Sequence, residues 1–86
     1  MAANAYVLLT VEPAKTAAIV KRLRAIPGAT VREVTGPYDV VVEVTKDTAV
    51  DITSLVRSKV RSIPGVTATI TCLWIEGFMG EGAGGE

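Results

Sequence analysis

Two segments of this chain are near copies of each other, 37 residues apart. The segment 24–31, Arg-Ala-Ile-Pro-Gly-Ala-Thr-Val, recurs as the segment 61–68, Arg-Ser-Ile-Pro-Gly-Val-Thr-Ala. Each copy follows apolar residues at helical spacing and precedes a stretch rich in β-branched residues. Because a strand pattern also precedes each helix, the chain is predicted to have the order βαβ-βαβ. The segment Gly36–Asp39 breaks this symmetry and is therefore the first place to look for a functional site.

The predicted elements alternate between strands and helices. Pro13 suits the first position of a helix, and Gly28 suits the left-handed position that ends it. Thr48 and Asp51 resemble a capping box before a second helix. The pattern predicts strands at 5–11, 29–35, 39–45 and 66–75, and helices at 14–25 and from the Thr48 cap to about Ser62. This order predicts an α+β protein, a ferredoxin-like βαββαβ sandwich with a four-stranded antiparallel sheet and two helices on one face.

Composition limits the classes of partner. A chain of 86 residues forms one domain, which buries only roughly 60% of its unfolded surface. Nearly half of the residues are apolar, so part of this apolar surface is expected to pack against another chain. The formal net charge is zero, so no global field attracts nucleic acid or an anionic membrane. We expect neither direct specific DNA binding nor membrane association.

The two ends of the chain and its cysteine content indicate the compartment. Residues 1–4 have neither the charged region nor the apolar stretch of a signal peptide, and Cys72 is the one cysteine. The cytoplasm is therefore the expected location. Five of the eight glycines fall within 77–86. We expect a single domain over residues 1–76 and a flexible Gly-rich tail over 77–86.

Alternation along the predicted strands divides the sheet into two faces. One face is apolar throughout and is expected to lie under the helices: Val7, Leu9, Val11, Val40, Val42, Val44, Ala68, Ile70 and Cys72. The other face is too apolar for water and too polar for a monomer core: Tyr6, Leu8, Thr10, Asp39, Val41, Glu43, Thr69, Thr71, Leu73 and Ile75. A second copy of the sheet packed on this face would resolve the mismatch.

Few residues in the chain suit catalysis. There is no histidine, which removes the commonest general base and metal ligand. No Cys-x-x-Cys, P-loop or Gly-x-Ser-x-Gly motif is present. Asp39 and Glu43 are four residues apart on one strand, about 13 Å, which is too far for an ordinary carboxylate pair. Cys72 is expected to be a small buried hydrophobe. An enzyme is therefore not expected, and no metal or other cofactor is expected.

Positive charge is concentrated on the predicted helices. Seven of the nine basic residues lie there, against one acidic residue, Asp51: Lys15, Lys21, Arg22, Arg24, Arg57, Lys59 and Arg61. A solvated helix face explains this pattern, with cations near the helix C-termini. A phosphate-binding patch is the alternative, and it is less favoured because such a patch normally belongs to a basic domain.

The segment 35–40, Thr-Gly-Pro-Tyr-Asp-Val, is the most specific of several matches to one family. The others are Ala-Tyr-Val-Leu-Leu at 5–9, Ile-Pro-Gly-Val at 63–66 and Thr-Ile-Thr at 69–71. In this order, from residue 5 to about 76, the chain resembles the effector-binding and oligomerisation (RAM) domain of the Lrp/AsnC regulators of bacteria and archaea. The first strand begins near residue 5, so a stand-alone form without the helix-turn-helix DNA reader is expected.

The resemblance implies a small-molecule sensor that assembles into homodimers through the sheets, and often into an octameric ring of four dimers. Amino-acid effectors would bind in clefts between neighbouring dimers. By position, the Gly36–Asp39 turn would form one wall, and Thr69 and Thr71, from an adjacent dimer, would offer hydroxyls on the other. The dimer interface is expected at Tyr6, Leu8, Val41, Leu73 and Ile75. The partner would be a full-length regulator or an enzyme.

The chemistry of these residues agrees with such a cleft, and structural roles remain open beside it. Asp39 is the one carboxylate of the motif and could bind an ammonium group. Backbone N–H groups of the turn and threonine hydroxyls could bind a carboxylate. Equally, Gly36 and Pro37 could serve only the turn, Tyr38 could be an interface aromatic, and Asp39 could cap the turn. The threonines could be present simply as good strand formers.

Two other functions also stay open. One is an enzyme of the dimeric α+β barrel type, although the lack of histidine and of clustered acids counts against it. The other is an ACT-like regulatory module acting on a metabolic enzyme, which usually lacks the Gly-x-Tyr-Asp turn. Binding without turnover in a metabolite screen would separate a sensor from an enzyme.

Overall fold

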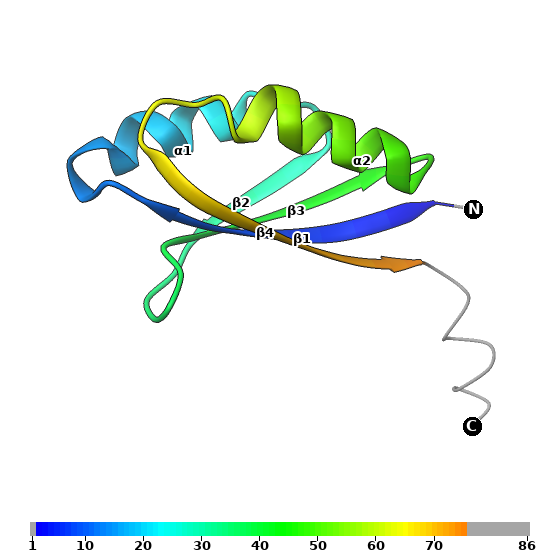
Figure 1. Cartoon of the computed structure of the whole chain (residues 1–86), viewed down its shortest axis with the longest axis horizontal. Coiled ribbons are helices and arrows are strands. Elements are labelled where there is room, and N and C mark those ends of the chain that lie inside the picture. The colour runs from blue at the N-terminus through cyan, green and yellow to red at the C-terminus, as the bar shows by residue number, and fades with distance from the viewer. Residues whose placement is uncertain (1, 76–86) are drawn as a thin grey trace.

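The computed structural model describes residues 2–75, and these form a sheet with helices on one of its faces (Figure 1). The elements are β1 (Ala3–Val11), η1 (Pro13–Lys15), α1 (Thr16–Arg24), β2 (Ala29–Glu33), β3 (Val40–Lys46), α2 (Ala49–Leu55), η2 (Val56–Val60) and β4 (Val66–Ile75). The strand order is β2-β3-β1-β4, and all neighbouring strands are antiparallel. The predicted ferredoxin-like βαββαβ fold is confirmed. The predicted tail, 77–86, lies outside the described residues.

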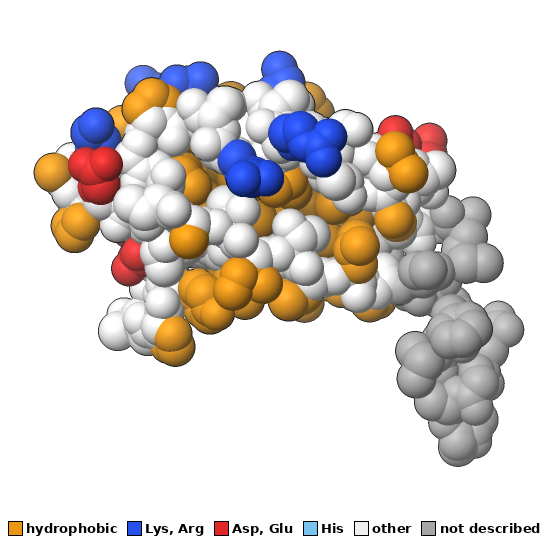
Figure 2. Space-filling model, viewed as in Figure 1, with side chains coloured by type: hydrophobic (Ala, Val, Ile, Leu, Met, Phe, Trp, Pro, Cys, Tyr) orange, Lys and Arg blue, Asp and Glu red, His pale blue; other side chains and the backbone are white. Residues whose placement is uncertain are grey.

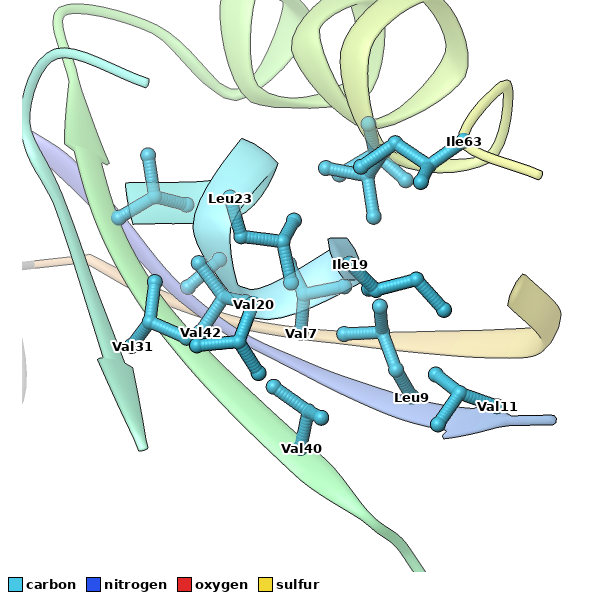
Figure 3. Packing of buried hydrophobic residues seen from close by; sticks show 14 of the residues in the cluster. Val7, Leu9, Val11, Ile19, Val20, Leu23, Val31, Val40, Val42 and Ile63 are labelled. Atoms are coloured by element: carbon cyan, nitrogen blue, oxygen red, sulfur yellow. The ribbon is translucent and has the colours of Figure 1, made fainter. Parts of the chain in front are cut away.

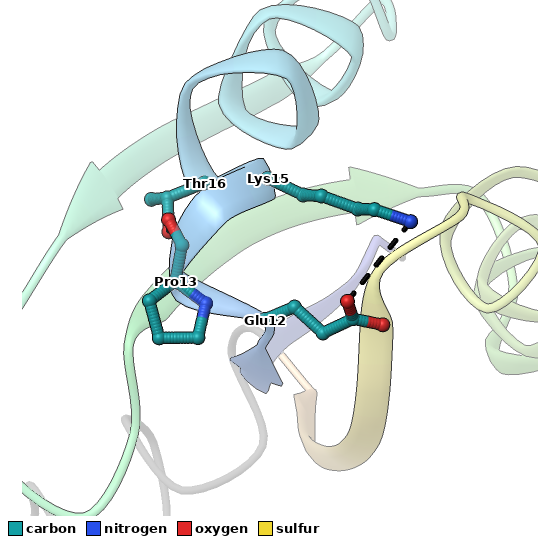
Figure 4. Close-up of polar contacts among 4 residues, drawn as sticks. All are labelled: Glu12, Pro13, Lys15 and Thr16. Atoms are coloured by element: carbon teal, nitrogen blue, oxygen red, sulfur yellow. Dashed lines mark hydrogen bonds and ion pairs between the residues drawn. The ribbon is translucent and has the colours of Figure 1, made fainter.

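The first helix begins with a 3₁₀ turn, which is wound more tightly than the α-helix that was predicted from residue 14. Pro13 opens a 3₁₀ turn, η1, and the α-helix proper starts at Thr16, whose hydroxyl donates to the Pro13 carbonyl at 3.0 Å (Figure 4). Lys15 Nζ lies 4.0 Å from Glu12 Oε1 in the same turn. Both side chains of this ion pair are about half exposed, so it adds little to stability.

The second helix begins at the predicted cap and ends differently. The Thr48 hydroxyl accepts the Asp51 N–H at 3.1 Å, so the capping role of Thr48 is confirmed. The continuous helix predicted to about Ser62 instead widens into a π-helix, η2, where the Arg61 N–H donates to the Val56 carbonyl at 2.8 Å. Val56 and Val60 are both buried within this wider turn.

The core lies between the helices and one face of the sheet (Figure 3). Val7 and Leu9 of β1 are fully buried against Ile19 and Leu23 of α1. Ile52 of α2 is also fully buried. Val40, Val42 and Val44 of β3 are buried as well, so the predicted inward face of the first and third strands is confirmed. Burial of this apolar surface is the main favourable contribution to folding.

A β-bulge near the start of β4 changes the expected arrangement. Thr10 pairs with Ala68 and Val11 pairs with Val66, which leaves Thr67 as an extra residue in β4. The Thr67 hydroxyl donates to the Thr10 carbonyl at 3.0 Å, and its oxygen lies 2.8 Å from Thr10 Oγ1. One extra residue inverts the alternation of every side chain that follows it.

The predicted faces of β4 are consequently wrong beyond the bulge. Thr69, Thr71 and Leu73 pair with buried residues of β1 and therefore lie on the helix side of the sheet. The residues that were expected in the core lie on the opposite face: Ala68, Ile70 and Cys72. Cys72 is exposed, so the prediction that it is a buried hydrophobe is also wrong.

The sheet face without helices, here called the open face, carries a row of apolar residues across three strands. Val41 pairs with Leu8, and Leu8 pairs with Ile70. Beside this row, the rings of Tyr6 and Trp74 lie with centroids 4.7 Å apart. The open face is thus defined by Tyr6, Leu8, Val41, Ile70, Cys72 and Trp74.

The predicted dimer-interface residues divide between the two faces. Tyr6, Leu8 and Val41 lie on the open face, as expected. Leu73 does not, because the bulge turns it toward the helices. Ile75 pairs with Ala3 at the end of β4, and its role in an interface stays a prediction.

Candidate ligand-binding groove

The Gly36–Asp39 turn links β2 to β3 and projects from the sheet on the side away from the helices (Figure 1). Asp39 anchors it. The Asp39 N–H donates to the Leu9 carbonyl at 2.9 Å, and the Asp39 carbonyl accepts from the Val34 N–H at 3.0 Å. Gly36 has a φ of 143°, a conformation that favours glycine, and the chain leaves the strand conformation at this residue.

The Asp39 carboxylate has a structural partner. Its Oδ2 accepts the backbone N–H of Val11 at 3.0 Å, across from the turn. The carboxylate therefore has a structural role, but it binds the end of β1 rather than capping the turn as the sequence suggested. Its other oxygen, Oδ1, has no hydrogen bond among residues 2–75. The carboxylate is thus held in place with one oxygen available to a ligand.

Thr69 and Thr71 lie in a groove between the second helix and β4. The groove has a volume of about 640 Å³, and its residues are Thr53, Val56, Arg57, Arg61, Val66, Thr67, Ala68, Thr69, Thr71 and Leu73. It exists because β4 is an edge strand and α2 packs mainly over β1 and β3. A volume of this size is typical of small-molecule sites.

The charge on the groove wall is positive. Arg57 and Arg61 line it, and no acidic side chain of residues 2–75 does. Neither arginine has an ion pair within the described part of the chain. Figure 2 shows Lys and Arg side chains gathered over the helices, with hydrophobic side chains in the hollow beneath them. The arrangement attracts anions rather than cations.

The predicted site residues are not brought together within one chain. In the sheet, β3 and β4 lie on opposite sides of β1. The turn leads into β3, whereas Thr69 and Thr71 lie on β4. The turn also projects away from the helices, and the two threonines lie on the helix side. The groove that contains Thr69 and Thr71 includes no residue of the turn. A site that uses both sets needs two protomers.

The sequence assigns Arg57 and Arg61 to the basic helix face, either as solvated cations or, less favoured, as part of a phosphate-binding patch. It does not assign them to the effector site. Their spacing with Thr53, four residues for each step, puts three polar residues on one side of the helix. That spacing was a usable signal, but it pointed to a groove only if Thr69 and Thr71 faced the helix.

Two kinds of feature are not found in the described residues. Within 2–75, no cluster of His, Cys, Asp or Glu side chains could hold a metal ion. None of the helices in this range is long and apolar enough to cross a membrane.

Comparisons with known proteins identify relatives. A family model described as the Lrp/AsnC ligand binding domain matches residues 4–81. The hypothetical protein PHS023 from Pyrococcus horikoshii is 27% identical, with a TM-score of 0.80 over 90% of this chain and 94% of its own. TTHA0845 from Thermus thermophilus is also 27% identical, with a TM-score of 0.82 over 88% of this chain and 96% of its own.

A longer regulator shares the fold. The transcriptional regulator NMB0573 from Neisseria meningitidis, solved as a complex with L-Met, is 16% identical, with a TM-score of 0.75. The match covers 88% of this chain and 51% of that one. Curated protein sequences give no significant match.

Proposed function

This chain belongs to the Lrp/AsnC ligand binding domain family, and from that premise we propose that it is an oligomeric regulatory protein that senses an amino acid or a similar small effector. The match over residues 4–81 is the observation that carries the proposal. The protein acts in the cytoplasm on a partner, a full-length regulator or an enzyme, and is not itself an enzyme.

The effector site is proposed to form between two protomers. The Gly36–Asp39 turn of one protomer supplies Asp39, whose free Oδ1 suits an ammonium group. The groove of the other supplies the hydroxyls of Thr69 and Thr71, which have no hydrogen bond among residues 2–75 and suit a carboxylate. An amino acid carries both groups, and L-Met, the ligand named for NMB0573, is of this class.

The dimer is proposed to form through the open face. The row Val41–Leu8–Ile70 crosses three strands, and no helix of the described chain covers it. Water contact with this row is unfavourable, and a second sheet packed on it would remove the apolar area from solvent. Because the groove lies on the helix side of the sheet, dimers formed in this way leave it accessible for contacts between dimers, including an octamer.

A binding screen combined with a mass measurement tests the proposal. The full chain is mixed with each of the twenty amino acids, melting is followed by thermal shift, and mass is followed by light scattering. We expect a subset of amino acids to raise the melting temperature and to shift the mass toward larger assemblies, because a ligand bound between dimers stabilises their association. A monomer that none of the twenty stabilises would contradict the proposal.

A further inference from the structure

We propose that the groove between the second helix and β4 binds a small dicarboxylate, with Arg57 and Arg61 as the residues that select it. The inference rests on the proposed function, because Thr69 and Thr71 belong to the same groove, and it names the chemical class of the effector. The class includes acidic amino acids and the corresponding acids without an amino group.

The charges in the groove favour an anion with more than one negative group. Arg57 and Arg61 are both on its wall, and neither is neutralised by an acid within residues 2–75. A guanidinium group binds a carboxylate through two parallel hydrogen bonds, whereas the ammonium group of lysine acts as a point charge. Two such groups beside one groove match a ligand with two carboxylates. A neutral amino acid would leave one arginine without a partner.

The remaining polar groups of the groove are compatible with the same ligand. The hydroxyls of Thr69 and Thr71 have no protein partner among the described residues and can donate to carboxylate oxygens. The Thr53 hydroxyl is already used, since it donates to the Ala49 carbonyl at 3.1 Å. The groove therefore offers two hydroxyl donors in addition to its two guanidinium groups.

The π-helix and several apolar side chains contribute to the lining of the groove. Arg57 lies within η2 and Arg61 follows it, where the Arg61 N–H donates to Val56. Such π segments are often found at functional sites. The groove is also lined by Val56, Val66 and Leu73. Apolar lining suits the methylene chain of a dicarboxylate and has no use in binding inorganic phosphate.

The experiment compares two dicarboxylates, with and without an amino group, with a neutral amino acid and a small inorganic anion. Binding of L-glutamate, 2-oxoglutarate, L-leucine and inorganic phosphate to the full chain is measured by calorimetry. The test variant is Arg57→Gln with Arg61→Gln. The matched control is Arg22→Gln with Arg24→Gln, which removes the same charge from exposed positions on α1, outside this groove. Circular dichroism melting confirms that both variants fold.

We expect glutamate and 2-oxoglutarate to bind and leucine and phosphate to bind at least about tenfold more weakly. The Arg57/Arg61 variant should lose about tenfold or more in affinity for both dicarboxylates, and the Arg22/Arg24 control should not. Phosphate that binds as tightly as 2-oxoglutarate would overturn the dicarboxylate class. Equal losses of dicarboxylate affinity in the two double variants would overturn the role of the groove.

A further variant, Asp39→Asn, separates this inference from the proposed function. This substitution should weaken the binding of glutamate, which has an ammonium group, and leave the binding of 2-oxoglutarate unchanged. If only neutral amino acids bind, and Asp39→Asn weakens them, the dicarboxylate inference fails and the proposed function stands. If dicarboxylates bind through the arginines and Asp39→Asn changes nothing, the inference stands and the proposed role of Asp39 fails.

Discussion

Asp39 combines a structural contact with a free acceptor. Its Oδ2 accepts the Val11 N–H at 3.0 Å, which fixes the carboxylate beside the end of β1. A fixed carboxylate loses less side-chain entropy when it binds a ligand than a mobile one does. The same hydrogen bond therefore supports both the turn and the proposed recognition of an ammonium group, and substitutions can separate the two roles.

Asp39→Asn and Asp39→Ala are expected to differ. Asparagine keeps an oxygen that can accept the Val11 N–H, so the fold should be retained. The loss of charge should lower the affinity for an amino-acid effector by roughly ten- to hundredfold. Alanine leaves the Val11 N–H without this acceptor, which should cost about 1 kcal/mol of unfolding free energy. Urea unfolding and calorimetry measure the two effects. A lower stability of Asp39→Asn with unchanged affinity would assign Asp39 a structural role only.

Gly65 is needed for both its backbone conformation and its lack of a side chain. Its φ is 99°, and a Cβ there would lie 3.0 Å from Lys15 Cβ and 3.0 Å from Ile19 Cδ1. Gly65→Ala should therefore cost more than the roughly 1–2 kcal/mol of the left-handed conformation alone. Gly28→Ala is the control, because its φ is 81° and its Cβ would approach only the Thr45 carbonyl, at 3.8 Å.

The two glycine variants are compared by urea unfolding of the full chain. The difference between them isolates the close approach of α1 to the segment before β4. Equal losses of stability in the two variants would show that the contacts of Gly65 relax without cost.

Among the strands and helices, the bulge at Thr67 has the largest consequence. The sequence predicted the element order, the glycine at the end of α1 and the Thr48 cap, because each depends on local chemistry. It did not predict the bulge, which is held by hydrogen bonds from Thr67 to Thr10, a residue distant in sequence. Regular alternation from Val66 then placed the threonines of β4 on the wrong face and left the groove undetected.

The capping of the second helix provides a test at the level of one element. Thr48→Ala removes the hydroxyl that accepts the Asp51 N–H at 3.1 Å, and it should destabilise the protein by about 1 kcal/mol. Ser58→Ala is the control, because the Ser58 hydroxyl donates to the Ser54 carbonyl within the helix and caps nothing. Ser58→Ala should change stability by less than about 0.5 kcal/mol. Thermal unfolding at a fixed protein concentration compares the two, and equal effects would contradict the capping role.

For the protein as a whole, the two layers have different surfaces. The helices carry most of the basic residues, and the groove that includes Arg57 and Arg61 opens beside them. The open face has an apolar row, Val41–Leu8–Ile70, beside polar residues such as Arg32 and Glu43, and has no helix of residues 2–75 over it. An apolar row at the centre of a face is suited to stable association, and a charged groove is suited to a reversible ligand. One surface can thus hold a dimer together while the other responds to an effector.

Two residues of β4 test which face forms the dimer. Ile70 is 46% exposed and Leu73 is 48% exposed, but the bulge and the register place Ile70 on the open face and Leu73 on the helix side. Ile70→Asp should bury an unpaired charge in the dimer, at a cost of several kcal/mol, and should give monomers. Leu73→Asp, nearly equally exposed but outside the open face, should remain dimeric.

Size-exclusion chromatography with light scattering at micromolar concentration measures this difference. Dissociation by Leu73→Asp and not by Ile70→Asp would place the interface on the helix side, and a monomeric unmodified protein would remove the dimer altogether. Because the two substitutions add the same charge to the same strand at nearly equal exposure, a difference between them would reflect the face on which each side chain lies.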